Sequence, residues 1–322
     1  MKQRILKLCL VTLLTTLLVG CVPSDKKVIV TSYPVEYLMK KIAGERVNVE
    51  RLYDGSVPQT ATIRSDYKDV LKNADAIFYI SELQPYWDTH ENQIQNEANN
   101  LEFVDLAERS VLYDFARYTT IRVDNELHVV ESSYYTPEAM GNVDTYDKDP
   151  FLWMDPLAMT SMARTVKDWL VANYPDEASI FQERYSQLEI ELTNLQADYQ
   201  NLRNYTGRIL FVSVTPSFGN WQRSFNLEVY PLTLSKYGVL PNEALLNDVR
   251  ARISSDNVGY IAFEPGLSNE QIQLYNQIKV EFDLQEIKLK NLFTLTEEDA
   301  EINADYLSIM YENLETLESM VR

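Results

Sequence analysis

Oxygen donors dominate the side chains of this sequence that could do chemistry. The 322 residues include 21 tyrosines and 48 acidic residues. Carboxylate and phenol oxygens suit a hard cation, and tyrosine rings suit an aromatic-lined slot for an organic ligand. The candidates are Tyr33, Tyr53, Tyr134, Tyr135, Tyr146, Asp144, Asp147, Asp149 and Asp155. The alternative is that the tyrosines pack in a core and that the acids are solvated, as charged loop residues usually are.

Histidine and cysteine, the stronger ligands for transition metals, are scarce. The only histidines are His90, in a helical stretch, and His128, in an irregular one. An imidazole site needs several convergent partners, so we interpret both as surface or partly packed residues. The only cysteines are Cys9 and Cys21.

The N-terminus has the pattern of a secretory signal. Lys2, Arg4 and Lys7 precede an apolar run over 8–19, which is too short to span a membrane comfortably. The run ends in Leu-Val-Gly-Cys, which resembles the cleavage site of bacterial lipoproteins and makes Cys21 the lipid-bearing first residue of the mature chain. The alternative is an ordinary signal peptide followed by an incidental cysteine. Because Cys9 leaves with the signal, counting excludes disulfides, thiolate metal sites and a cysteine nucleophile from the mature chain.

Composition bounds the class of protein. The 45% hydrophobic content predicts a folded globular chain, and the length predicts two lobes. The formal charge of −19 argues against a nucleic-acid partner, which would need clustered Lys and Arg. We expect a monomer that is anchored by lipid outside the cytoplasm and is otherwise soluble.

Motifs give little support to an enzyme. The chain has no G-x-S-x-G, P-loop, G-x-G-x-x-G or H-E-x-x-H motif, because His90-Glu91 is followed by Asn-Gln-Ile. A glycosidase-type pair of carboxylates stays open, since the separation of two acids cannot be read from sequence.

The elements that position these residues alternate between strand and helix. Strands are predicted at 28–32, 47–52, 76–80, 101–106, 208–214, 228–232, 259–263 and 281–287. Helices are predicted near 35–43, 65–74, 84–97, 241–255, 268–278 and 302–320. This order indicates βαβ crossovers and hence an α/β fold with two lobes, each a mainly parallel sheet flanked by helices. Ligands lie beyond the carboxyl ends of such strands, so the functional loops should start near Ser32, Tyr53, Val214 and Glu264.

One long helix separates the two sets of strands. Apolar residues recur every three or four positions from Phe181 to Leu202, and no Gly or Pro occurs over 178–203. Such a helix is about 39 Å long and can join two lobes rigidly. Residues 107–150 have little periodicity and are interpreted as a surface insertion in the first lobe. The predicted organisation is a signal (1–20), a tether (21–27), an N-terminal lobe (28–177), a connecting helix (178–204) and a C-terminal lobe (205–322).

Six short motifs, in order, resemble one known family. They are Val30-Thr31-Ser32-Tyr33-Pro34, Gly55-Ser56-Val57-Pro58, Trp153-Met154-Asp155-Pro156, Phe263-Glu264-Pro265, Leu295-Thr296-Glu297-Glu298-Asp299 and Asp305-Tyr306-Leu307-Ser308. Together they resemble the zinc- and manganese-binding lipoproteins of bacterial ABC transporters, over roughly 28–320. The resemblance implies two α/β lobes joined by a rigid helix, a metal held between them and delivery to a membrane permease. Some members of that family are described as adhesins.

The sequence departs from that family at the expected metal ligands. Where the resemblance implies two histidines, a third histidine or glutamate and a final Asp or Glu, this chain has Gln59, Phe151, Thr215 and Ser268. A phenyl ring cannot coordinate zinc, and amide and hydroxyl oxygens are weak donors. Tyr33, Asp155 and Glu264 are further candidates for the cleft. We therefore expect a lipid-anchored binding protein of a metal-type ABC transporter that has lost the usual zinc or manganese site; the alternatives are a surface interaction protein derived from it and an unrecognised hydrolase.

Overall fold

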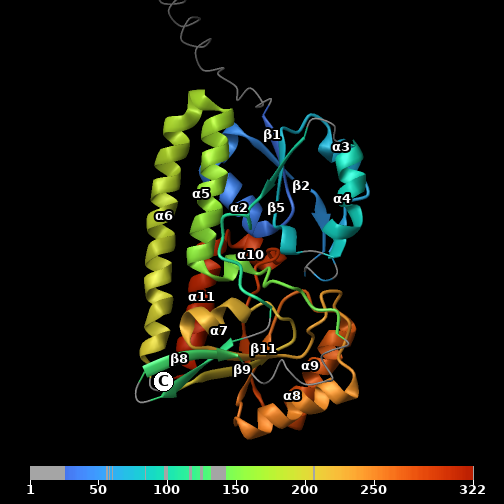
Figure 1. Ribbon diagram of the computed structural model, residues 1–322, viewed down its shortest axis with the longest axis vertical. Helices are drawn as coiled ribbons and strands as arrows, with labels where there is room; N and C mark the ends of the chain where they lie inside the picture. The colour runs from blue at the N-terminus through green and yellow to red at the C-terminus, as the bar shows by residue number, and fades with distance from the viewer. Residues whose placement is uncertain are drawn as a thin grey trace, which may run out of the picture.

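The computed structural model describes residues 26–55, 57, 59, 61–83, 85–97, 101–115, 118–123, 126–131, 143–205 and 207–321. Two parallel sheets of four strands each lie one above the other in Figure 1. The first sheet has the order β2 (Asn48–Arg51), β1 (Lys27–Val30), β5 (Ala76–Tyr79) and β6 (Glu102–Asp105). The second has the order β10 (Leu227–Pro231), β9 (Ile209–Ser213), β11 (Tyr260–Phe263) and β12 (Gln285–Lys288). The predicted two-lobed α/β fold with mainly parallel sheets is confirmed.

Both faces of the first sheet are buried, which explains its continuous apolar strands. Val28 and Val30 face the main core, whereas Ile29 packs in a smaller cluster on the other face with Ile77 and Trp87. This alternation follows from the two-residue period of a strand. A parallel sheet has helices on both faces, so the strand residues that point to either face must be apolar.

Ten helices are found among the described residues. They are α2 (Tyr33–Ala43), α3 (Tyr67–Leu71), α4 (Pro85–Glu97), α5 (Pro156–Asn173), α6 (Ala178–Gln200), α7 (Gly219–Phe225), α8 (Glu243–Ser255), α9 (Asn269–Glu281), α10 (Glu297–Glu301) and α11 (Tyr306–Ser319). Within the described ranges, no helix combines the length and the apolar character that crossing a bilayer requires.

The long helix α6 is present as predicted and ends in a 3₁₀ turn at Asn201–Asn204. All seven of its periodic apolar residues are buried: Phe181, Tyr185, Leu188, Leu192, Leu195, Tyr199 and Leu202. The helix runs beside both sheets and packs along α5 (Figure 1). The sequence analysis did not identify α5, which begins where the Asp155 side chain accepts a hydrogen bond from Leu157 N and Pro156 occupies the first turn.

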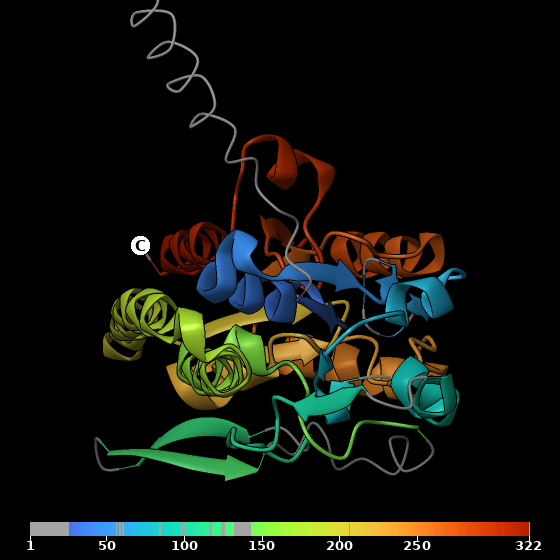
Figure 2. The same ribbon diagram turned by 90° about the horizontal axis from the view of Figure 1, so that it is seen from above.

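The interpretation of 107–150 as an irregular insertion needs correction. It contains an antiparallel hairpin of β7 (Tyr118–Val123) and β8 (Glu126–Glu131), with Val123 paired to Glu126. A two-residue loop between β-rich runs is a hairpin signal, and the analysis missed it. The hairpin also lies against α7 and β10 of the second lobe, on the opposite face from α10 and α11 (Figure 2).

Several predicted features lie outside the described residues. These are the signal over 1–20, Cys21 with most of the tether, Ser56, Pro58, Tyr134 and Tyr135. The division into lobes at 177 and 204 stays a prediction. His90 lies on α4, where it is partly buried, and His128 lies in β8.

Candidate functional site

Thr215 and Glu264 meet at the carboxyl end of the second sheet. Thr215 follows β9 and Glu264 follows β11, and these strands are neighbours through the pairing of Val212 with Ile261. Because β10 and β11 lie on opposite sides of β9, this is the switch point at which ligands bind in open α/β sheets. The sequence analysis located this loop cluster correctly.

The Glu264 carboxylate is fully engaged by the protein. Its Oε1 accepts hydrogen bonds from Val214 N at 2.8 Å and Thr215 N at 2.9 Å, and its Oε2 accepts one from Thr215 Oγ1. Both side chains have no exposed surface. Burial raises the pKa of Glu264 to about 7, against the lowering effect of the hydrogen bonds from Thr215. The pair therefore fastens two strand ends together and offers a cation no open carboxylate.

Phe151 lies in a buried aromatic cluster that also contains Tyr53, Tyr146, Trp153 and Phe293. Its ring centroid is 6.0 Å from that of Tyr146 and 5.6 Å from that of Trp153. Phe293 continues the cluster, at 6.5 Å from Trp153 and 5.4 Å from Tyr53. All five side chains are at most 5% exposed. The position that matches a histidine ligand in the family pattern is therefore part of a hydrophobic core.

Direct hydrogen bonds join the segment around Phe151 to elements of the second sheet's lobe. Asn220 Nδ2, on α7, donates to Phe151 O at 3.0 Å. Trp153 Nε1 donates to Asn291 O at 2.7 Å, and Trp221 Nε1 donates to Met154 O at 2.7 Å. Buried indole and amide groups need such partners, so these bonds fix the segment against the second lobe.

Gln59 is buried in the loop between β3 (Tyr53–Asp54) and β4 (Thr62–Ile63) and is 6% exposed. Within the described part of the chain, neither its Nε2 nor its Oε1 has a hydrogen-bond partner. A buried amide left unpaired is unfavourable by about 1–3 kcal/mol, so it marks a point where a polar ligand would gain affinity. Thr215 and Glu264 are in contact with each other, whereas no hydrogen bond ties Gln59 to them among the described residues.

Two other candidates serve as helix caps. Ser268 Oγ accepts from Gln271 N at 3.2 Å while the Gln271 side chain accepts from Ser268 N, which is a capping box at the start of α9. Asp155 caps α5 and accepts from Ser224 Oγ at 2.7 Å, and burial raises its pKa. The Ser268 side chain is therefore engaged by its own helix, and its assignment to the cleft stays a prediction.

The acids of 144–149 do not converge either. Asp149 Oδ1 accepts from Phe151 N at 3.1 Å, and Asp144 Oδ1 lies 3.8 Å from Lys236 Nζ. No group of three His, Cys, Asp or Glu side chains that could hold a metal occurs among the described residues. The amide, phenyl ring and hydroxyl of Gln59, Phe151 and Thr215 are a donor set that does not fit zinc.

The sequence reasoning missed Asn291 and Phe293, which follow β12 and complete the aromatic cluster. Tyr33 N donates to Phe293 O at 3.1 Å, which links the start of α2 to this loop. The rule that selected the loops after the other strands also applies to β12, so the same signal was available.

A family model described as the periplasmic component A of the zinc-uptake complex, ZnuA, matches residues 28–320. The chain belongs to the ZnuA family. It is 23% identical to the zinc-binding lipoprotein AdcA of Streptococcus pneumoniae over 326 residues, which cover 97% of this chain and 60% of AdcA. The chain thus spans about 60% of the length of this curated relative.

Solved structures of the family share the fold. A crystal structure of ZnuA superposes with a TM-score of 0.72 at 18% identity, covering 92% of this chain and 99% of that one. A mutant of the laminin-binding adhesin Lmb from Streptococcus agalactiae superposes with a TM-score of 0.70 at 15% identity, covering 92% and 99%. The ZnuA family comprises metal-binding transport proteins and not enzymes, in agreement with the absence of catalytic motifs.

Proposed function

We propose that this chain is an extracytoplasmic, lipid-anchored binding protein of a metal-type ABC transporter whose interlobe cleft no longer takes zinc or manganese. Membership of the ZnuA family supports the transport class, and Cys21 supports the anchor. The observation that carries the loss of the metal site is the complete burial of Phe151 among aromatic rings, at a position that matches a ligand.

The physical argument concerns charge as well as donor type. A divalent cation between Gln59, Phe151 and Thr215 would meet an amide, a phenyl ring and a hydroxyl, none of which is anionic. Its 2+ charge would stay uncompensated in a desolvated site. Glu264 is the nearest acid to Thr215, but its oxygens already accept three hydrogen bonds. Neutral polar cargo fits this cleft better, because Gln59 offers both an unpaired donor and an unpaired acceptor.

Metal analysis of the purified protein tests the proposal. We expect no zinc or manganese at stoichiometric level after purification, and no binding in calorimetric titration tighter than about micromolar, or about −8 kcal/mol. Modest excess metal should also leave the melting temperature unchanged. A matched Gln59→His/Phe151→His/Thr215→His variant asks whether imidazoles at these positions restore zinc binding. Retained stoichiometric zinc with a sub-micromolar Kd in the unmodified protein would overturn the loss of the site.

Direct hydrogen bonds across the cleft favour a second candidate, a surface interaction lipoprotein. Asn220 and Trp153 hold the segment 151–154 against the second lobe without an intervening ligand. A relative with the same fold is described as a laminin-binding adhesin. Stimulation of a metal-type permease's ATPase in proteoliposomes would support the transport role. Saturable binding to immobilised laminin, with no effect on that ATPase, would support the interaction role.

A further inference from the structure

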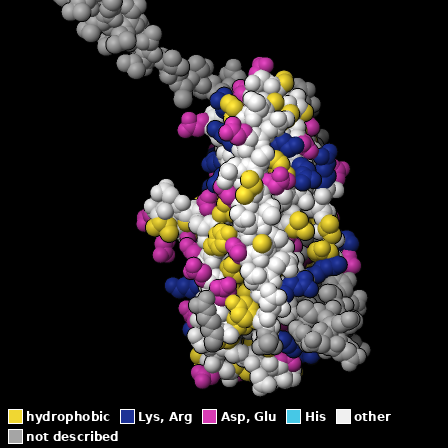
Figure 3. Space-filling view, turned by 90° about the vertical axis from the view of Figure 1, so that its left-hand side faces the viewer, with side chains coloured by type: hydrophobic (Ala, Val, Ile, Leu, Met, Phe, Trp, Pro, Cys, Tyr) yellow, Lys and Arg dark blue, Asp and Glu magenta, His cyan; other side chains and the backbone are white. Residues whose placement is uncertain are grey.

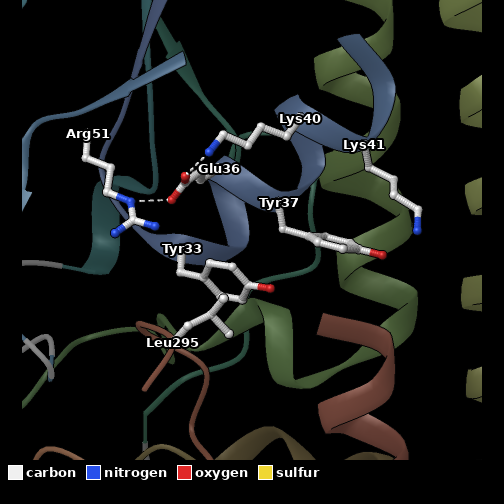
Figure 4. Close-up of a pocket in the computed structure, with 7 residues that line it drawn as sticks. All are labelled: Tyr33, Glu36, Tyr37, Lys40, Lys41, Arg51 and Leu295. Carbon is white, nitrogen blue, oxygen red and sulfur yellow. Dashed lines mark hydrogen bonds and ion pairs between the residues drawn. The ribbon is translucent and has the colours of Figure 1, made fainter. Parts of the chain in front are cut away.

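A surface pocket lies where α2 meets the loop before α10, and it includes Tyr33, one of the cleft candidates. Its volume is about 330 Å³. The lining residues are Tyr33, Glu36, Tyr37, Lys40, Lys41, Arg51 and Leu295 (Figure 4). None of them belongs to the aromatic cluster around Phe151. The lining of the pocket is therefore separate from the cluster that contains Phe151.

The pocket is locally basic in an acidic protein. Three cations and one acid line it, although the whole chain has a formal charge of −19. The acid, Glu36, is 4% exposed and is neutralised on both oxygens, by Lys40 Nζ at 2.5 Å and by Arg51 Nε at 2.5 Å. Figure 3 shows a part of the surface that projects from the body, with acidic side chains on and near it. Lys41 Nζ is paired in turn with Asp305 Oδ2 at 3.5 Å and Glu191 Oε2 at 3.8 Å, so Arg51 is the cation of the lining that a negatively charged ligand would meet.

Arg51 keeps unused hydrogen-bonding capacity. Its Nε is occupied by Glu36, but Nη1 and Nη2 make no hydrogen bond within the part of the chain that the structure describes. The guanidinium lies on the Tyr33 side of the pocket (Figure 4). A planar pair of N–H donors matches the two oxygens of a carboxylate. Glu36 holds the Arg51 guanidinium in place through Nε. The side chain has therefore lost part of its conformational freedom before a ligand binds.

The walls are aromatic and apolar. Tyr33 and Tyr37 are 5% and 6% exposed, and their ring centroids are 6.4 Å apart. Leu295 contributes from the facing loop. The Tyr37 hydroxyl is buried and has no hydrogen-bond partner within the described residues, whereas buried polar groups normally have one. It lies at the other end of the pocket from Arg51 (Figure 4).

We propose that this pocket binds a small aromatic carboxylate with a polar group opposite its carboxylate. The carboxylate pairs with Arg51 Nη1 and Nη2, the ring packs on Tyr33, Tyr37 and Leu295, and the distal polar group accepts a hydrogen bond from the Tyr37 hydroxyl. The volume is at the small end of the roughly 300–1,000 Å³ range of ligand pockets, which suits a molecule with one ring. Inorganic phosphate fits less well, because apolar walls would desolvate oxygens that they cannot pair.

Calorimetric titration with 4-hydroxybenzoate as the probe tests the assignment. We expect saturable binding by the unmodified protein at a stoichiometry of one. Arg51→Gln should weaken it at least about tenfold, and Arg51→Lys, which keeps the charge without the fork, should give a smaller loss. Arg109→Gln is the matched control, because Arg109 pairs with Asp168 outside the pocket and its loss removes the same charge.

Further measurements separate the parts of the proposal. Benzoate should bind more weakly than 4-hydroxybenzoate, and Tyr37→Phe should abolish that difference. Equal weakening by Arg109→Gln and Arg51→Gln would mean a general charge effect and would overturn the role of Arg51. Equal binding of inorganic phosphate, or of neutral benzamide, would overturn the aromatic carboxylate. Absence of binding by unmodified, folded protein would overturn the site, whatever the outcome of the zinc titration.

Discussion

Replacing Glu264 with glutamine should remove a specific part of the protein's pH dependence. Glu264 is fully buried, and burial raises the pKa of its carboxyl to about 7 from an ordinary value of 4.5. Below pH 4.5 the group is protonated in both the folded and the unfolded chain. Between pH 4.5 and 7 only the unfolded chain releases the proton, so the free energy of unfolding falls as the pH rises. Above pH 7 both states are ionised and the loss is complete.

The size of the effect follows from the two pKa values. The difference between the two pKa values corresponds to about 3 kcal/mol, as an order of magnitude. Glutamine keeps an oxygen that accepts from Val214 N and Thr215 N, and its amide can donate to Thr215 Oγ1 in place of the bond that Glu264 Oε2 accepts from that hydroxyl. Glu264→Gln should therefore fold, and its free energy of unfolding should lack this fall between pH 4.5 and 7.

Urea unfolding followed by tryptophan fluorescence at several values between pH 4.5 and 8 measures the difference. Trp153 and Trp221 are fully buried and report on the core. Between pH 4.5 and 8, we expect the free energy of unfolding of Glu264→Gln to rise by about 3 kcal/mol relative to that of the unmodified protein. Glu315→Gln, at an exposed position, is the control. Its free energy of unfolding should change with pH in the same way as that of the unmodified protein. A constant difference between Glu264→Gln and the unmodified protein at all pH values would refute the reasoning.

Two further predictions concern single side chains. Ser268→Ala should lower the free energy of unfolding by about 1 kcal/mol through loss of the α9 cap, without changing ligand binding. Thermal melts measure this loss, with Ser255→Ala, at an exposed helix end, as the control. Impaired ligand binding with an unchanged melt would place Ser268 in the cleft. Cys21→Ala should release the protein from membranes or leave its precursor uncleaved, because acyl chains supply the apolar area for attachment; unchanged membrane fractionation of that variant would contradict lipidation.

The sequence predicts the fold well because both of its periodicities are strong. The eight strands of the two sheets lie within a few residues of the predicted runs, since buried parallel strands leave unbroken apolar stretches. The spacing of Phe181 to Leu202 predicts α6 because every one of those positions is buried. The hairpin β7–β8 was missed because its strands alternate only weakly, and α5 was missed although Asp155 and Pro156 form a clear helix start.

The candidate site is less predictable because it depends on distant contacts. The rule for strand ends brought Thr215 and Glu264 together correctly. The same reasoning could not show that Glu264 is used up by backbone amides, or that Ser268 caps α9, because those facts depend on side-chain direction. Nothing in the local sequence of Phe151 indicates that Phe293 and Tyr53 extend its cluster.

The aromatic cluster holds its elements together without a ligand. In a metal receptor, ligands from two lobes would be joined by the ion they share, so removing the ion would loosen them. Here Phe151 and Trp153 pack on Tyr146 and Phe293, and Asn220 and Trp153 bond across to backbone carbonyls. Apolar burial is favourable by about 25 cal/mol per Å², and it requires no ligand. The contacts around Phe151 therefore hold these elements together without a ligand, so under the proposed function a cargo must compete with packing that is already complete around Phe151.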